Sequence, residues 1–286
     1  MKRLLISLVW LTASLTLAAQ TGKVFDNLSF ASNILKSERK FAIYLPPDYE
    51  TSQRSYPVLY LLHGSGDNQT GWIQFGEVLR IADQAILEGK ATAMIIVMPD
   101  ADTQVRGYFN NIQGTWKYED FFFQELIPYI EKTYRARSEK RYRAIAGLSM
   151  GGGGTLMYAL HHPELFVAAC PLSASVGSIP GAPNNRRPQT GTTQIDEATI
   201  EAYQKNHSAI ELVNSLPAEK ISSVRWYIDC GDDDFLYEGN ALLHIALRKK
   251  EIPHQYRVRD GSHSWRYWRE ALPEVLDFVS QSFHQN

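Results

Sequence analysis

The sequence predicts an α/β fold built on a mainly parallel β-sheet with helices on both of its faces. Short, continuously apolar runs of strand length, such as 56–62 (YPVLYLL) and 93–99 (AMIIVMP), recur along the chain. Each is followed by a longer segment whose apolar residues recur at helical spacing, such as 75–87 and 118–134. Continuous apolar strands that alternate with amphipathic helices are typical of parallel sheets covered on both sides.

The same alternation continues through the second half of the chain. The further strand-like runs are 142–147, 166–170, 224–230 and 254–260, and the further helix-like segments are 155–162, 238–250 and 268–283. The early part differs, because 28–49 contains two runs in which apolar and polar residues alternate, and Pro46 and Pro47 end the second run. This pattern predicts an antiparallel hairpin, so that the N-terminal strands are antiparallel in a mainly parallel sheet.

The mature chain is predicted to be one domain, 20–286. No internal repeat, low-complexity block or Pro/Ser-rich linker divides it. The exception to the alternation is 173–222, an insertion of about 50 residues that is loop-like at first and then offers short helices. Such an insertion is either a lid or pocket wall, or a surface segment packed beside the core, and composition does not choose between them.

Residues 1–19 are predicted to be a cleaved signal peptide. Lys2 and Arg3 give a positive start, 4–17 is largely apolar, and Ala18 and Ala19 provide a small-residue end. A membrane anchor is the alternative, but the apolar run is shorter than the ~20 residues that a spanning helix needs. We therefore expect an exported protein, periplasmic or secreted and of bacterial type, with no membrane attachment after cleavage.

The charge balance excludes a nucleic-acid partner. The chain has 29 Lys and Arg against 31 Asp and Glu, and removing Lys2 and Arg3 changes the balance from −2 to 27 − 31 = −4. The basic pairs 186–187 and 249–250 are too short to form a phosphate-binding stripe.

The two cysteines, Cys170 and Cys230, each end an apolar run and are predicted to be buried thiols. Export makes a disulfide between them chemically possible, so this pairing stays open. Because the chain has no CxxC or His/Cys cluster, no metal site is expected.

One short motif indicates chemistry. Ser149 lies between Gly147 and Gly151, where a buried strand gives way to a helix-like segment. In a G-x-S-x-G turn the glycines permit a tight bend that holds the serine hydroxyl clear of the sheet. The amide of Met150 then lies at the positive end of the next helix, where it stabilises an oxyanion. The alternative is a glycine-rich packing turn; a phosphate loop is disfavoured because Gly-Lys-Ser/Thr is absent.

A nucleophilic serine needs a base and an acid that orients it, and in this sheet type both follow later strands in the order Ser, Asp, His. His263 follows the last strand-like run, and the acidic run 232–234 follows the one before it. The remaining histidines do not occupy such a position. Spacing alone does not choose among the three aspartates, and Asp229 and Asp260 are also near.

The second oxyanion donor is predicted in 63–66 (HGSG), directly after the first buried parallel strand. A glycine-rich bend there turns a backbone N–H toward Ser149. In this interpretation the amide of Ser65 pairs with that of Met150, and His63 is structural.

These motifs together resemble the esterase D-like branch of the α/β-hydrolases. The segments that carry the resemblance are LLHGSGDNQTGW, MPDADTQVRGYFNN, YEDFFFQELIPYIEKTYR, AIAGLSMGG, YIDCGDDDFL and GSHSWRYWRE, and it extends from about Phe41 to the end. This branch includes feruloyl and acetylxylan esterases of the first carbohydrate esterase family, with S-formylglutathione hydrolases and mycolyltransferases as relatives. The resemblance implies Ser149 as nucleophile and His263 as base, and it favours Asp234, which lies three residues after a glycine and directly before Phe-Leu.

The implied reaction is two-step acyl transfer through an acyl-enzyme, which requires no metal or cofactor. The resemblance and the expected export favour acyl esters of plant cell-wall polysaccharides as substrate, feruloyl esters first. Alternatives are an acetylxylan esterase or another carbohydrate deacetylase, an acyltransferase, and a non-catalytic carbohydrate-binding protein.

Several aromatic residues near the presumed active edge are candidates for substrate walls. We name Trp72, Trp116 and Trp265 as candidate substrate-binding residues, with Tyr108 and Phe109 in the same group of loops. Core packing is the alternative for each of them. The oligomeric state is not indicated.

Overall fold

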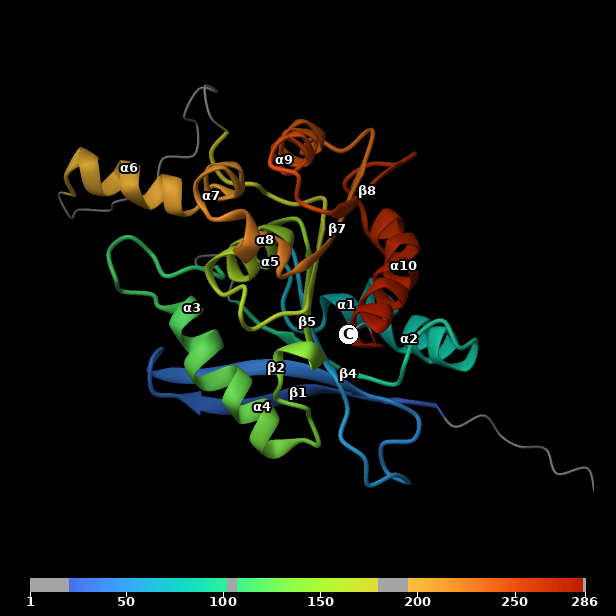
Figure 1. Ribbon diagram of the computed structural model, residues 1–286. Coiled ribbons are helices and arrows are strands. Elements are labelled where there is room, and N and C mark those ends of the chain that lie inside the picture. Colours follow the sequence, from blue (N-terminus) through green and yellow to red (C-terminus); the bar gives the residue numbers. More distant parts are fainter. Residues whose placement is uncertain (1–20, 102–106, 180–194, 285–286) are drawn as a thin grey trace, which may run out of the picture.

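We describe the protein from a computed structural model, which covers residues 21–101, 107–179 and 195–284 (Figure 1). The predicted signal segment 1–19 lies outside the described residues. Within the described ranges, no helix carries an apolar stretch long enough to cross a bilayer.

The described residues form one eight-stranded sheet. Its strands are β1 (Lys23–Ser32), β2 (Ser37–Leu45), β3 (Val58–Leu62), β4 (Ile95–Pro99), β5 (Arg143–Leu148), β6 (Ala168–Leu172), β7 (Arg225–Gly231) and β8 (His254–Arg259), in the spatial order β1-β2-β4-β3-β5-β6-β7-β8. Strands β3 to β8 are parallel to one another, whereas β1 pairs antiparallel with β2, and β2 antiparallel with β4. The predicted mainly parallel sheet with antiparallel N-terminal strands is confirmed.

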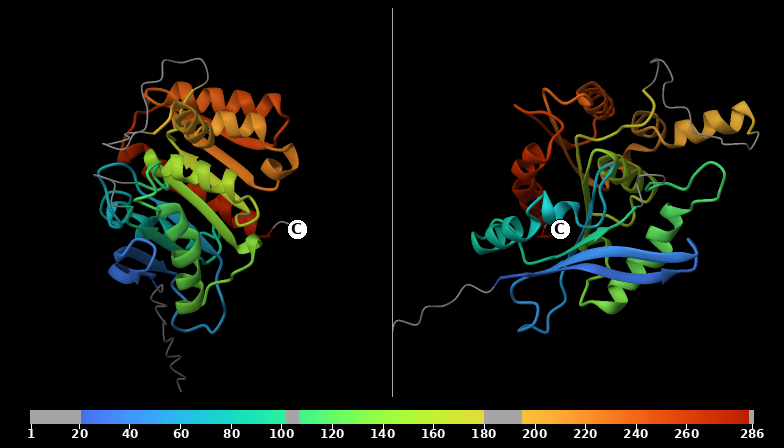
Figure 2. Two further views of the ribbon diagram at one scale, coloured as in Figure 1. Left: turned by 90° about the vertical axis from the view of Figure 1, so that its left-hand side faces the viewer. Right: turned by 180° about the vertical axis from the view of Figure 1, so that it is seen from behind.

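Helices cover both faces of the sheet, as predicted. They are α1 (Gly71–Gln74), α2 (Val78–Leu87), α3 (Tyr118–Phe121), the π-turn η1 (Phe122–Leu126), α4 (Ile127–Thr133), the 3₁₀ turn η2 (Lys140–Tyr142), α5 (Met150–His161), α6 (Glu197–Asn206), α7 (Ala209–Ser215), α8 (Ala218–Ser222), α9 (Tyr237–Lys249) and α10 (Trp265–His284). Helices α2 and α10 lie on one side of the sheet, and α3, α4 and α5 lie on the other (Figures 1 and 2).

Strand β3 shows why these strands are apolar throughout. Leu59 and Leu61 pack into the core beneath α2 and α10, whereas Tyr60 and Leu62 pack into the core beneath α4 and α5. None of these side chains is exposed. Because neighbouring side chains point to opposite faces, a strand covered on both sides buries all of them. Each buried leucine stabilises the fold by about 1.5–3 kcal/mol.

The segment 173–222, predicted as an insertion, supplies α6, α7 and α8 between β6 and β7. Asp196 caps α6 by accepting a hydrogen bond from the Thr199 amide (2.9 Å), and Ser208 caps α7 through the Glu211 amide (3.3 Å). Helix α7 packs beside α5 and α9, whereas α6 projects from the body of the protein (Figures 1 and 2). Residues 180–194 of this segment lie outside the described residues.

A buried ion pair attaches the end of α6 to the core. His161, at the end of α5, donates through Nδ1–H to Glu119 of α3 (2.7 Å) and through Nε2–H to the carbonyl of Asn206 (2.9 Å). Because a carboxylate and a carbonyl only accept, making both bonds requires the doubly protonated imidazolium. His161 therefore joins three separate helices when it is charged.

The pKa values of this pair reflect the same contact. Burial by itself would raise the pKa of Glu119, but hydrogen bonds from His161 and His162 and their charges outweigh it, so the pKa falls from its ordinary 4.5 to about 2. Burial by itself would lower the pKa of His161, but the hydrogen bond to Glu119 and its charge outweigh that effect and raise it above its ordinary 6.5.

We expect Glu119→Gln to lower the free energy of unfolding by about 1–3 kcal/mol near pH 6. The Glu119 contribution is present above pH 4.5 and is lost as the pH falls toward about 2. The His161 contribution is full below pH 6.5 and is lost as the pH rises through its raised pKa. Urea unfolding of both proteins across this range should therefore give the largest difference between about pH 5 and 6.5.

Glu201→Gln is the matched control, because Glu201 pairs with Lys205 on the surface, where both side chains are 62% exposed. We expect no pH-dependent change in that variant. A Glu119→Gln variant as stable as the wild type at pH 6 would contradict the assignment.

Candidate active site

The turn between β5 and α5 holds Ser149 in a conformation that few residues other than glycine adopt, with φ 55° and ψ −115°. Its tightness depends on both flanking glycines. A Cβ on Gly147 would lie 2.5 Å from the carbonyl oxygen of Gly151, and one on Gly151 would lie 2.5 Å from that of His63. The helix can therefore approach the sheet closely enough to present Ser149 only because no side chain intervenes.

Three predicted residues meet at this turn. Nε2 of His263 lies 2.9 Å from Oγ of Ser149, and Nδ1 lies 2.8 and 3.0 Å from the two carboxylate oxygens of Asp234. A carboxylate only accepts, so Nδ1 carries the proton and the unprotonated Nε2 accepts the serine hydroxyl. This tautomer gives the imidazole a lone pair directed at the hydroxyl.

The Asp234 carboxylate lies in a buried position that keeps it charged. The residue is 1% exposed, and its Oδ1 accepts the amide N–H of Leu236 at 2.8 Å. Burial by itself would raise the pKa of Asp234, but hydrogen bonds from His263, the Leu236 amide and the Ser173 hydroxyl outweigh it and lower the pKa. The carboxylate is thus ionised at neutral pH.

Asp229, which the sequence left as an alternative, has other partners. It is fully buried and accepts hydrogen bonds from the hydroxyls of Tyr227 and Tyr267 and from the guanidinium of Arg259. Both carboxylate oxygens of Asp229 are therefore engaged by partners other than His263.

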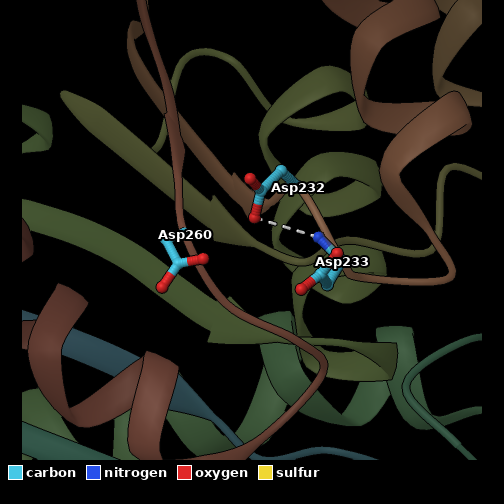
Figure 3. A group of neighbouring side chains, drawn as sticks. All are labelled: Asp232, Asp233 and Asp260. Carbon is cyan, nitrogen blue, oxygen red and sulfur yellow. Dashed lines mark hydrogen bonds between the residues drawn. The ribbon is translucent and has the colours of Figure 1, made fainter.

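The other three carboxylates form an exposed cluster of Asp232, Asp233 and Asp260 (Figure 3). Oδ1 of Asp232 accepts the amide N–H of Asp233 (3.1 Å, the dashed line in Figure 3) and that of Gly261 (3.0 Å). Asp232 thereby joins the loop after β7 to the loop after β8. These contacts give Asp232 a structural role, and the expectation that the protein needs no metal stays a prediction. Of the five neighbouring aspartates, Asp234 is the one that contacts His263.

Ser173 is a site residue that the sequence analysis missed. It directly follows β6, is fully buried and has φ 45°. Trp268 donates its indole N–H to the Ser173 oxygen (3.0 Å), which leaves the hydroxyl proton to be donated to Asp234. The only sequence signal was position, because sites gather where parallel strands end.

The two predicted oxyanion donors belong to the turn at Ser149 and to the turn after β3. Met150 opens α5, so its amide has no acceptor within the helix. A Cβ on Gly64 would lie only 3.5 Å from Cβ of Ser149, so the turn that follows β3 passes directly by the serine. Ser65 is the next residue in this turn and is exposed. The fold thus brings the turn that contains Ser65 beside Ser149, and the oxyanion role of the two amides stays a prediction.

His63 fixes this turn through its ring. Nδ1–H donates to the carbonyl of Gly64 (2.9 Å), and Nε2 accepts the amide N–H of Ala101 (3.2 Å). Burial lowers the pKa of His63, so the ring is neutral and both nitrogens are used. These contacts agree with a structural role for His63.

The three tryptophans predicted near the substrate occupy different environments. Trp72 and Trp116 are 0% and 4% exposed, and each donates its indole N–H to a backbone carbonyl, at 3.0 and 2.8 Å. Their burial favours packing roles. Trp265 is half-buried and contacts Trp72 edge-on (centroids 5.2 Å apart) and Phe75 (5.8 Å). A substrate role for Trp265 stays a prediction.

Both cysteines are buried free thiols, which was the favoured of the two interpretations. Burial raises the pKa of the Cys230 thiol to about 12 and that of Cys170 further. Neither thiol forms a reactive thiolate at neutral pH.

Comparisons with known proteins agree with this geometry. The family model described as "Putative esterase" matches residues 32–279. A solved structure of a ferulic acid esterase is 38% identical with a TM-score of 0.80, and the match covers 92% of this chain and 99% of that one. The acetyl esterase of Caldicellulosiruptor saccharolyticus is 24% identical over 269 residues, which is 89% of this chain and 97% of that protein.

A further relative matches only part of the chain. The endo-1,4-beta-xylanase/feruloyl esterase of Xylanibacter ruminicola is 40% identical over 131 residues, which is 43% of this chain and 18% of that protein. The family match covers most of the chain and includes the strands and turns that present Ser149, His263 and Asp234. The chain therefore belongs to the esterase family of α/β-hydrolases, whose members are carboxylic ester hydrolases.

Proposed function

We propose that this protein is a serine esterase that removes acyl groups from plant cell-wall polysaccharides, feruloyl esters first, through an acyl-enzyme. The observation that carries the proposal is the continuous hydrogen-bonded chain from Ser149 through His263 to Asp234, at 2.9 and 2.8 Å. In this arrangement a base lies within reach of a nucleophile and is oriented by a buried carboxylate.

In the first step, Nε2 of His263 takes the proton of the Ser149 hydroxyl as Oγ bonds to the ester carbonyl carbon. Asp234 stabilises the imidazolium that forms and keeps the ring in position. When the tetrahedral intermediate collapses, the bond from carbon to the alcohol oxygen breaks, and the imidazolium gives its proton to that oxygen. In the second step, His263 takes a proton from water as the water oxygen bonds to the acyl carbon. The bond from that carbon to Oγ of Ser149 then breaks, His263 returns the proton to Oγ, and the acid leaves.

The amides of Met150 and Ser65 are proposed to bind the carbonyl oxygen while it carries negative charge. Met150 contributes a free N–H at the positive end of α5. Removing one such donor generally costs about 10²–10³ in kcat, which makes oxyanion binding a major part of the rate enhancement.

The proposed identity of the acyl group is supported by the comparisons with known proteins rather than by the hydrogen bonds of the site. A 38% identical structure is named a ferulic acid esterase, and a 40% identical segment belongs to a protein named for feruloyl esterase activity. The half-buried ring of Trp265 contacts Trp268 (centroids 5.4 Å apart), which in turn contacts His263 (4.9 Å), and a ring in this position would suit an aromatic acid. A carbohydrate deacetylase is the second candidate, because a relative that matches 89% of this chain is an acetyl esterase.

Export and domain organisation belong to the same proposal. A polysaccharide substrate requires a protein outside the cytoplasm, in agreement with the signal peptide expected at 1–19. We propose that 20–286 is a single catalytic domain, in which α7 of the 173–222 insertion packs beside α5 and α9 while α6 projects from the body.

The first test is release of acid from methyl ferulate and from p-nitrophenyl acetate. We expect turnover of both, with ferulate preferred, and a loss of about 10⁶-fold in kcat for Ser149→Ala because the nucleophile is gone. Turnover of acetate alone would favour the deacetylase. Equal rates for wild type and variant would contradict the proposed mechanism, and transfer of the acyl group to an added sugar would indicate an acyltransferase.

Asp234→Asn should lower kcat by about 10⁴-fold, because an amide stabilises the wrong tautomer of His263 and cannot balance the imidazolium charge. Asp233→Asn is the matched control: it changes the neighbouring, exposed carboxylate in the same way and should leave kcat within about twofold. Steady-state kinetics on p-nitrophenyl acetate distinguish the two. Comparable losses in both variants would argue against Asp234 as the specific partner.

Ser173→Ala should lower kcat/KM by about tenfold, because Asp234 loses a hydrogen-bond donor that holds it in place. A carboxylate with fewer donors also holds the imidazole proton more strongly, so the acid limb of the kcat/KM profile should move to higher pH. Ser280→Ala removes a buried hydroxyl that serves the Thr92 amide in a remote part of α10, and it should leave the profile unchanged. An unchanged profile in Ser173→Ala would show that its hydroxyl is structural only.

A further inference from the structure

Phe235 is a large aromatic residue that lies on the surface beside the proposed base. It directly follows Asp234 and is 71% exposed. Its ring centroid lies 4.4 Å from that of His263, at an interplanar angle of 49°. An exposed ring in direct contact with a site residue is a candidate binding surface, because burying it against a ligand would recover the cost of hydrating it.

The backbone on both sides of Phe235 is fixed. The amide of Leu236 donates to Oδ1 of Asp234 (2.8 Å), and the amide of Tyr237 donates to the Asp234 carbonyl (2.9 Å). Asp234 is itself held by His263. The ring is therefore presented by a tight turn that the site requires, and its place beside His263 is determined by the same hydrogen bonds.

The proposed mechanism identifies which part of a substrate comes near this ring. The imidazolium of His263 must give its proton to the alcohol oxygen as the ester bond breaks, so that oxygen lies about 3 Å from Nε2. The acyl carbonyl oxygen lies instead at the amides of Met150 and Ser65. The alcohol half of the ester is therefore adjacent to His263, whose ring is in contact with Phe235.

We propose that Phe235 is a stacking surface for the sugar residue that carries the ester, an inference that rests on the proposed function. One face of a sugar ring presents C–H groups, which pack favourably on the electron-rich face of an aromatic ring. With the acyl group at the oxyanion donors and the sugar on Phe235, the bond to be cleaved lies between Ser149 and His263. Phe235 thereby selects for carbohydrate esters over simple alkyl esters.

The test compares substrates that share an acyl group and differ in the alcohol. One pair is methyl ferulate and feruloyl-arabinofuranosyl xylobiose; the other is methyl acetate and acetylated xylobiose. Phe235→Leu keeps an apolar cover over His263 but removes the flat ring, and Phe235→Tyr keeps the ring. Phe25→Leu is the matched control, because Phe25 is 43% exposed on β1, at the opposite edge of the sheet.

We expect Phe235→Leu to lower kcat/KM for the saccharide ester of the active pair by about tenfold while the methyl ester changes by less than about twofold. Phe235→Tyr should retain the saccharide preference. Phe25→Leu should leave both substrates unaffected.

Equal losses on saccharide and methyl esters in Phe235→Leu would overturn the inference, because the ring would then only shield the hydrogen bond between His263 and Asp234 from water. No loss on either ester would also overturn it, as would a wild type that does not prefer the saccharide ester. Failure of the proposed function is a separate outcome, namely absence of turnover in the wild type or full activity in Ser149→Ala.

Discussion

Helix α5 lies closer to the sheet than side chains at Gly147 or Gly151 would permit, and the geometry of the site depends on this close approach. It forces the chain to reverse within a few residues, so Ser149 adopts a positive φ and its hydroxyl stands clear of β5. The same approach brings the turn after β3 beside the serine. The positions of the proposed nucleophile and of the turns that carry its proposed oxyanion donors therefore depend on one packing contact.

Around that contact, hydrogen bonds that join α10 to the loops after β6, β7 and β8 hold the site residues in place. Trp268 orients Ser173, Ser173 and the Leu236 amide hold Asp234, and Asp234 holds His263. Each link has at least one buried partner, so breaking it would leave a buried polar group unpaired. Precise placement of the imidazole is what a proton transfer in both directions requires. The loop that contains Phe235 is fixed by the same hydrogen bonds, so this exposed aromatic ring has a defined position beside the proposed base.

The fold class and the order of the site residues could be predicted because they depend on local pattern. Apolar runs followed by helical spacing indicate a parallel sheet covered by helices, and the carboxyl ends of such strands meet at one edge. Ser149, His263 and the run 232–234 all follow such strands in the expected order, so their proximity could be inferred without coordinates. The resemblance to a known family then favoured Asp234 over its neighbours.

The tertiary structure decided which side chains near the site are buried and which way each of them points. The three consecutive aspartates look alike in the sequence, but only Asp234 points inward to His263, whereas Asp232 accepts amides at the surface. Trp72 in α1 and Phe235 in the loop after β7 are both aromatic, yet one is fully buried and the other is 71% exposed. Ser173 contacts Asp234 from the end of β6, a distant segment of the chain. The sequence by itself determined which residues follow a strand and so reach the proposed active edge, because strands are recognised from local pattern. Which way each side chain points there is set by contacts between distant segments, and only the folded chain brings those segments together.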